Sequence, residues 1–219
     1  MFLRARKTGP RKTNAQASIL WKERPMSDHE KTSESDPIVV DFLPQEELEL
    51  PGQLGLTLAP GKKTDEKDVR WERDLETDLK RLREEYGVGV LASLMERDEY
   101  SDLEIPDLSQ KAEEQGMEVL YLPIPDYGVP SASEDDDYRP FIEDIANRIE
   151  EGETVVVHCR GGLGRSGLVA ASILVALGRS AEAAIKTVRG AREGAVETPD
   201  QEDRVRLFEM ELQAENKEG

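Results

Sequence analysis

The sequence predicts an α/β fold in which a central, mainly parallel, twisted sheet carries helices on both faces. Strand-like and helix-like segments alternate along most of the 219 residues, which is typical of a parallel sheet covered on both sides. The run 154–157, Thr-Val-Val-Val, is short and β-branched, as expected of a strand buried on both faces. The length suits one domain with a tail.

The first half of the domain alternates short strands with one clear helix. Strands are expected at 38–40, where three apolar residues adjoin, at 54–58, where leucines alternate, and at 88–91, where valines recur. Pro60 and Gly61 end the second of them. Apolar residues recur at spacings of four, three and four over 75–86, which predicts an amphipathic helix that Gly87 ends.

The second half repeats the alternation with longer helices. A strand is expected at 117–122, before the buried run at 154–157. In the helix over 138–150, Phe141, Ile145 and Ile149 recur every four residues and are expected to face inward. The remaining expected helices are 107–115, 165–177, 181–191 and 199–213.

We expect one domain over residues 37–213, with a disordered tail at 1–36 and a disordered end at 214–219. The tail is rich in Lys, Arg, Thr and Ser and shows no sustained periodicity. Met26 is an alternative native start, which would make the upstream stretch a spurious extension. A basic start also resembles an organelle-targeting segment, but no amphipathic arginine helix follows it, so we favour the tail or the spurious extension.

Composition excludes several classes of protein. The longest run free of charge and proline covers 166–178, 13 residues, too short to span a bilayer. With one cysteine and two histidines, neither a disulfide framework nor a multi-cysteine zinc site can form, and we expect no metal or other cofactor. A net charge of −18 disfavours binding to nucleic acid or an anionic membrane. We expect a cytoplasmic monomer, and salt adaptation is an alternative cause of the acidity.

A glycine-rich loop joins the buried strand to the next helix. It begins with His158-Cys159, ends with Arg165-Ser166, and has glycines at 161, 162 and 164. Such glycines let backbone N–H groups and a helix N-terminus point at an anion. Arg165 can hold two phosphate oxygens with its guanidinium, and positive surroundings favour the thiolate of Cys159. The loop thus combines a nucleophile with a phosphate cradle, as attack on a phosphate monoester requires.

The pattern His158-Cys159-(x5)-Arg165-Ser166 resembles the signature of the cysteine-dependent protein phosphatases. The full wording, His-Cys-Arg-Gly-Gly-Leu-Gly-Arg-Ser-Gly, is most similar to the cyclin-dependent-kinase-associated phosphatase group of the dual-specificity branch. The segments 60–63, 68–70, 74–75 and 123–126 look like that group as well, so the resemblance covers roughly 50–212. It implies a phosphatase fold and hydrolysis of phosphotyrosine or phosphoserine/phosphothreonine in proteins through a phosphocysteine.

The resemblance also implies roles for individual residues of the loop. Cys159 would be the nucleophile, His158 would brace the loop, and Ser166 would stabilise the departing thiolate. A buried structural cysteine and a helix-start serine are the plainer interpretations. Arg160 would either add a positive contact or be solvated. The residues expected to bind phosphate are Arg160, Gly161, Gly162, Leu163, Gly164 and Arg165.

Two further residues are candidates outside the loop. Asp126 follows a predicted strand, and because loops after strand C-termini line the crevice of such sheets, it should share a space with Cys159. The resemblance makes it the general acid, whereas a turn aspartate between prolines is the plainer interpretation. Gln201 resembles the glutamine that positions water, but Thr198, Pro199 and Gln201 also fit a helix N-cap.

Two other functions remain as alternatives. One is a phosphoprotein-binding regulator without catalysis, although such proteins usually lose the cysteine, the arginine or the acid, and Cys159, Arg165 and Asp126 are all present. The other is a rhodanese-type sulfurtransferase, whose cysteine also follows a strand but whose loop typically reaches its arginine one residue sooner. The expected partner is a phosphorylated protein or peptide substrate.

Overall fold

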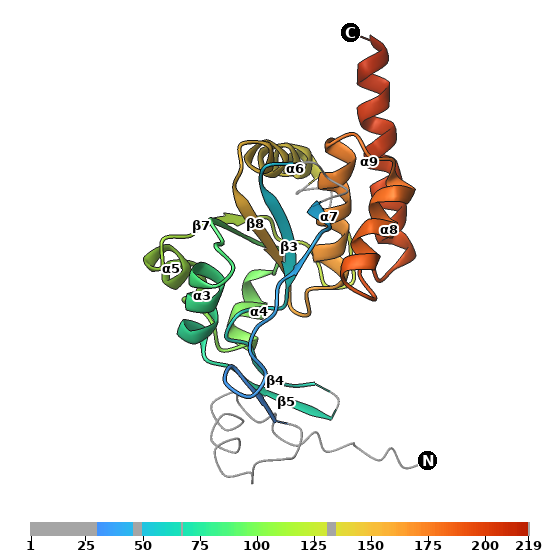
Figure 1. Cartoon of the computed structure of the whole chain (residues 1–219). Coiled ribbons are helices and arrows are strands. Elements are labelled where there is room, and N and C mark those ends of the chain that lie inside the picture. The colour runs from blue at the N-terminus through green and yellow to red at the C-terminus, as the bar shows by residue number, and fades with distance from the viewer. Residues whose placement is uncertain (1–29, 46–49, 67, 131–134, 219) are drawn as a thin grey trace, which may run out of the picture.

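The computed structural model describes residues 30–45, 50–66, 68–130 and 135–218, which form a central sheet with helices on both faces (Figure 1). The strands of this sheet lie in the spatial order β2 (Asp41–Phe42), β3 (Gln53–Thr57), β8 (Thr154–His158), β6 (Val90–Ser93) and β7 (Glu118–Tyr121). β2 is antiparallel to β3, and the other neighbouring strands pair in parallel. The predicted α/β class and mainly parallel sheet are confirmed.

The central strand β8 separates two hydrophobic cores. Its residues alternate between the faces of the sheet: Val155 and Val157 belong to one core and Val156 to the other, all fully buried. This explains why the run carries no polar alternation, since neither face of the strand meets water. β8 pairs with β3 on one side and β6 on the other.

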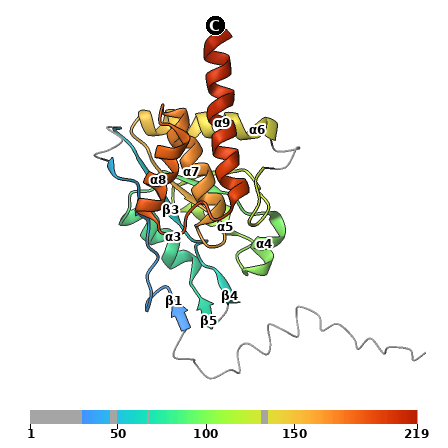
Figure 2. The same ribbon diagram turned by 90° about the vertical axis from the view of Figure 1, so that its right-hand side faces the viewer.

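The helices divide between the two faces (Figures 1 and 2). One core contains residues of α6 (Asp135–Glu150), α7 (Gly164–Ala176), α8 (Ala181–Ala191) and α9 (Pro199–Glu218). The other contains residues of α3 (Leu75–Glu84), α4 (Arg97–Asp102) and α5 (Leu108–Glu114). Helix α7 packs against α6, α8, α9 and the sheet, and it is buried along nearly its whole length, so the segment that follows the glycine-rich loop lies at the centre of the domain.

A second, three-stranded sheet was not predicted from the sequence. Its order is β1 (Glu30–Thr32), β5 (Val69–Glu72) and β4 (Lys63–Glu66), with β1 parallel and β4 antiparallel to β5. A fully buried ion pair lies next to it, in which Arg73 Nε and Nη2 donate to both carboxylate oxygens of Asp78, at 2.7 and 2.8 Å. Loss of one member of such a pair typically costs about 3–5 kcal/mol of stability.

Three expectations about the ends of elements were wrong. Residues 30–36 were placed in a disordered tail, but they include β1, and the Ser33 hydroxyl donates to the Asp74 carbonyl; residues 1–29, including Met26, lie outside the described part. The strand expected at 38–40 is β2 at Asp41–Phe42 instead, because Ile38 and Val40 are buried in the α3-side core without pairing in the sheet. Helix α9 continues to Glu218, through residues expected to be disordered.

Candidate active site

The glycine-rich loop lies at the C-terminal end of β8, where the ends of β3 and β6 flank it. We call residues 159–165 the cysteine loop. Gly162 has a φ of +73°, and a Cβ there would lie 2.2 Å from the Thr57 carbonyl oxygen of β3, so only glycine fits. This turn directs the Gly162 N–H at the Cys159 sulfur, 3.2 Å away. The backbone therefore already supplies a hydrogen bond to the sulfur.

Cys159 is shielded from the outside but faces a cavity. Only 3% of the residue is exposed, yet it lines a cavity of about 540 Å³. The other lining residues are Glu66, Val69, Trp71, Asp126, Tyr127, Arg160, Gly161, Leu163, Gly164, Arg165 and Glu197. The prediction that Asp126 and Cys159 share one space is therefore confirmed.

Arg165 is buried and held by an acid that sequence reasoning missed. Glu99 of α4 accepts from Nη1 at 2.5 Å and from Nη2 at 2.9 Å, and the Ile124 carbonyl accepts from Nη1 at 3.1 Å. Burial raises the pKa of Glu99, but hydrogen bonding and the charge of Arg165 outweigh it, so that pKa is lowered. This bidentate contact fixes the orientation of the guanidinium.

One nitrogen of the Arg165 guanidinium remains without a partner. Its Nε is buried and makes no hydrogen bond to the described residues. An unsatisfied buried donor is costly, and its presence at a cavity is a reason to expect a ligand. The guanidinium therefore keeps one donor for an anion held above Cys159.

Asp126 lies in a turn after β7, with its carboxylate on the Arg165 guanidinium. Oδ1 accepts from Arg165 Nη2 at 2.9 Å, and the side chain is 46% exposed. The Gly128 N–H donates to the Pro125 carbonyl at 2.9 Å, which closes the turn. We call residues 125–128 the acid loop. It brings a carboxylate to the cavity from a different element than the cysteine loop.

His158 and Ser166 lie beneath the cysteine loop, fully buried. Burial lowers the pKa of His158 to about 4, so the ring is neutral at pH 7 and does not supply the positive charge that would lower a thiol pKa. The Ser166 hydroxyl has no hydrogen-bond partner among the described residues. Stabilisation of a thiolate is left to the loop amides, the start of α7 and Arg165.

Arg160 lines the cavity, and its side chain also binds residues of β4. Its Nε donates to Glu66 Oε1 at 2.9 Å and Nη2 donates to Thr64 Oγ1 at 3.3 Å. Glu66 also accepts from Lys62 Nζ at 2.7 Å, and the buried Lys62 stacks on Trp71, 4.7 Å from the ring centroid. The side chain of Arg160 thus joins the cysteine loop to β4, a contact that sequence reasoning did not foresee.

Gln201 is fully buried and does not line the cavity. Its backbone N–H donates to the Thr198 hydroxyl at 3.2 Å, which confirms the N-cap interpretation of this segment. In the same segment it is Glu197 that lines the cavity, with Oε2 so close to Gly164 that a Cβ there would lie 2.6 Å from it. Sequence reasoning missed Glu197.

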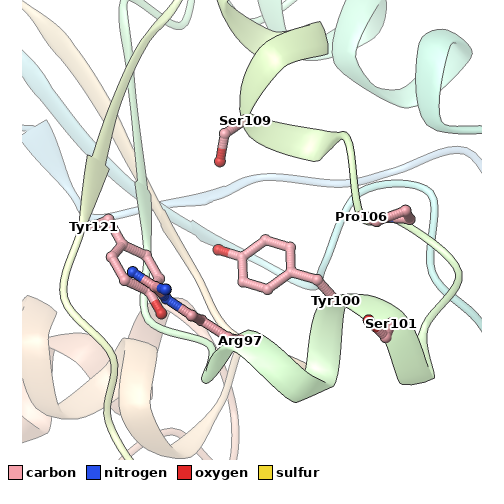
Figure 3. A pocket seen from close by; sticks show the side chains of 6 residues that line it. All are labelled: Arg97, Tyr100, Ser101, Pro106, Ser109 and Tyr121. Atoms are coloured by element: carbon pink, nitrogen blue, oxygen red, sulfur yellow. The ribbon is translucent and has the colours of Figure 1, made fainter.

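A second cavity, of about 380 Å³, lies between α4, α5 and β7 (Figure 3). Its lining residues are Arg97, Tyr100, Ser101, Pro106, Ser109 and Tyr121, none of which lines the first cavity. Figure 3 shows Arg97 reaching from the start of α4 towards Tyr121. The Tyr100 hydroxyl lies 2.5 Å from the Ser93 hydroxyl. This cavity contains neither the cysteine nor a carboxylate, so the first cavity is the better candidate for chemistry.

Within the described part of the chain, no helix combines the length and apolar character needed to cross a membrane.

Comparisons with known proteins show the family to which the chain belongs. A protein-family model described as "Cyclin-dependent kinase inhibitor 3 (CDKN3)" matches residues 13–185. Cyclin-dependent kinase inhibitor 3 of Rattus norvegicus is 32% identical over 201 residues, which cover 90% of this chain and 91% of that protein.

Solved structures of phosphatases share the fold. Kinase associated phosphatase, with its catalytic-site cysteine replaced by serine, superposes with a TM-score of 0.71 at 30% identity, over 81% of this chain and 97% of that one. The active form of Tk-PTP superposes with a TM-score of 0.57 at 31% identity, over 73% and 92%. The phosphatase-like fold that the resemblance implied is confirmed.

Proposed function

Because this chain belongs to the cyclin-dependent kinase inhibitor 3 family, we propose that it is a catalytically active protein phosphatase. It hydrolyses phosphotyrosine or phosphoserine/phosphothreonine monoesters of proteins through a phosphocysteine intermediate, without a metal or other cofactor. The observation that carries the proposal is the arrangement of three side chains around one cavity: Cys159 beneath a glycine N–H, Arg165 held by Glu99, and Asp126 at the rim.

In the first step the Cys159 thiolate attacks phosphorus and forms an S–P bond while the ester P–O bond breaks. The loop amides and the free Nε of Arg165 hold the equatorial oxygens, which carry charge in the transition state. Arg165 needs no rearrangement to do so, because Glu99 already fixes its orientation. The Gly162 N–H points at the sulfur that makes this attack.

The leaving oxygen takes its proton from Asp126. In the structure without substrate this carboxylate pairs with Arg165. A bound phosphate dianion competes for the guanidinium, so Asp126 is released from this ion pair and can act as the acid. Proton transfer then neutralises the departing alkoxide or phenolate.

In the second step water attacks phosphorus, the S–P bond breaks, and its electron pair returns to sulfur. Asp126, now ionised, accepts the proton of the water, and inorganic phosphate leaves. The buried Ser166 hydroxyl, free of other partners among the described residues, can donate to the sulfur as the thiolate re-forms. His158 is buried and neutral at pH 7.

We further propose that the protein acts in the cytoplasm. Its nucleophile is a single cysteine that has to stay reduced, and the cytosol keeps thiols reduced. Three acids, Glu66, Asp126 and Glu197, line the cavity, which disfavours polyanionic substrates such as inositol lipids and nucleic-acid ends.

Replacement of the nucleophile tests the function. We expect Cys159→Ser to lower turnover of p-nitrophenyl phosphate more than ~10³-fold, because a serine hydroxyl stays protonated at neutral pH. Binding of tungstate, a phosphate analogue, should persist because the loop amides and Arg165 remain. Turnover is measured beside a panel of phosphotyrosine and phosphothreonine peptides, which assigns the preferred substrate.

The same experiment separates the alternatives. A wild-type protein that binds phosphopeptides but hydrolyses none of the panel would be a phosphoprotein-binding regulator. A protein that forms a persulfide from thiosulfate would be a sulfurtransferase. Substantial turnover in Cys159→Ser would contradict the assignment of the nucleophile.

A further inference from the structure

We propose that Gln201 is a positioning residue that holds the acid loop closed over the cysteine loop, and that it does not orient the hydrolytic water. The inference rests on the proposed phosphatase function and assigns this side chain a part in the first step, the transfer of phosphate to sulfur. Its basis is a set of hydrogen bonds that ties the Gln201 amide to the backbone just before α9 and to the acid loop.

The neighbouring backbone decides how the Gln201 amide is oriented. Its Oε1 accepts from the N–H of Glu197 at 2.9 Å and of Thr198 at 3.3 Å. Two N–H donors require an acceptor, so the amide cannot be flipped, and its NH₂ group must point the other way. There it donates to the Gly128 carbonyl of the acid loop at 3.1 Å.

The same amide also packs on the cysteine loop. A Cβ on Gly164 would lie 3.0 Å from Gln201 Nε2 and 3.1 Å from Oε1. Gln201 therefore lies between Gly164 and Gly128, one residue from each of the two loops that meet at the cavity. A buried side chain with this many partners is rigid, so it relates the two loops at a set distance.

The acid loop needs such support. Its Tyr127 has a φ of +57°, a left-handed conformation that is unfavourable for a residue with a Cβ, and its side chain is largely exposed. The Thr198 hydroxyl lies 3.4 Å from the Tyr127 carbonyl, a second and longer contact from the same helix start. Strained conformations persist where surrounding contacts hold them. Loss of these contacts should let Asp126 leave its position at the cavity.

A water-orienting role predicts a different structure. Such a residue lines the cavity, whereas Gln201 does not and its amide binds the backbone of Glu197 and Gly128. Gln201 acts through Asp126, so it should matter most when the leaving group needs a proton.

The decisive variant is Gln201→Glu. It keeps the shape and the Oε1 acceptor for the two N–H groups, but it places an oxygen where the NH₂ group faced the Gly128 carbonyl. We expect kcat/KM for a phosphothreonine peptide to fall about ten-fold, a fraction of the contribution of a general acid, and kcat/KM for p-nitrophenyl phosphate to fall less than about two-fold. Activated aryl leaving groups hardly need the acid.

Two controls accompany it. In an Asp126→Asn background, Gln201→Glu should add no further discrimination between the two substrates, since the group that it positions is already lost. The rate at which iodoacetate alkylates Cys159, measured at a pH at which the thiolate is fully formed, should be unchanged, because the nucleophile and its loop amides are intact. Thr198→Val, which removes the contact to Tyr127 and also the N-cap bond to the Gln201 N–H, should show a weaker form of the same leaving-group dependence if Gln201→Glu fails to fold.

Each other outcome overturns the proposal. An equal loss for both substrates, or slower alkylation, would show general damage to the site. Unchanged kcat/KM with a burst of p-nitrophenol would show that Gln201 serves hydrolysis of the phosphocysteine. Wild-type kcat/KM for both substrates in Gln201→Glu would refute only the positioning role of Gln201. A wild-type protein without any turnover would refute the proposed function.

Discussion

The two loops that meet at the cavity are built in opposite ways. The cysteine loop runs from the central strand β8 straight into the buried helix α7, and its hydrogen bond to sulfur comes from a glycine only three residues from Cys159. The acid loop follows the edge strand β7, and its contacts come from Arg165 and Gln201, residues far along the chain. The shape of the cysteine loop is thus encoded by neighbouring residues, whereas the position of Asp126 in the acid loop depends on contacts with distant parts of the chain.

The largest expected effect is on the cradle alone. Gly162→Ala should lower kcat/KM by about 10³-fold, comparable to the loss of oxyanion-type donors, because its φ of +73° and the Thr57 carbonyl 2.2 Å from the new Cβ force the loop to move. Gly161→Ala is the matched control, since nothing lies within 4 Å of a Cβ there. We expect it to lose at most about three-fold, as is usual for a substitution without a steric conflict.

Turnover of p-nitrophenyl phosphate and alkylation of Cys159 measure this pair. Both should fall in Gly162→Ala if the cradle has lost its shape. Equal activity in the two alanine variants would show that the loop is not preformed, and the contrast between the two loops would disappear.

The next largest expected effect is on the free energy of unfolding and comes from the buried His158. The pKa of His158 is about 4 in the folded protein and about 6.5 when unfolded. Below pH 6.5 the unfolded chain therefore binds a proton that the folded protein does not. The free energy of unfolding should fall by about 2 kcal/mol between pH 6.5 and 5, where most carboxylates are still ionised.

Urea unfolding at a series of pH values measures this slope. His158→Gln supplies the control, because it removes the titrating ring and should flatten the curve over this interval. A wild-type slope identical to that of His158→Gln would mean that the ring is accessible to protons in the folded state.

The smallest expected effect concerns Glu99. It binds Arg165, the residue of the cysteine loop that also contacts the acid loop. Glu99→Gln keeps the shape behind Arg165 but removes the charge and one acceptor of the bidentate contact. We expect kcat/KM to fall about ten-fold, the equivalent of one charged hydrogen bond. The loss should be equal for phosphothreonine peptides and p-nitrophenyl phosphate, because Arg165 serves the phosphate and not the leaving group.

Measurement of kcat/KM for both substrates tests whether the two losses are equal. A loss confined to the phosphothreonine peptide would show that Glu99 acts on the acid loop instead, through the Arg165–Asp126 pair.

Local patterns were sufficient for the regular elements around the cradle. The helix predicted over 181–191 is α8 at Ala181–Ala191, and the strand predicted over 154–157 is β8 with one more residue. Their apolar spacing directly reflects which face is buried. The helix α4 and the strands β4 and β5 were missed, because they are short and mostly polar and carry little periodicity.

The supporting residues of the site could not be predicted in the same way. Glu99, Glu66 and Glu197 are three acids in a chain with 47 acidic residues, and no motif distinguishes them. Each was identified only by what it touches: Arg165, Arg160, or the space beside Gly164. Two roles were predicted for Gln201. Its part in the helix N-cap is confirmed, and its side-chain amide donates to the Gly128 carbonyl.

The sequence by itself determined the α/β fold, the cysteine loop and the position of the arginine, because strand periodicity, glycine conformations and the spacing of Cys159 and Arg165 act over a few neighbouring residues. Only the tertiary structure decided what orients Arg165, where Arg160 points and what holds Asp126 at the cavity. Those contacts join residues that lie dozens of positions apart in the sequence. Many side chains carry the same charge, and only the packing of the fold decides which of them lies close enough to make the contact.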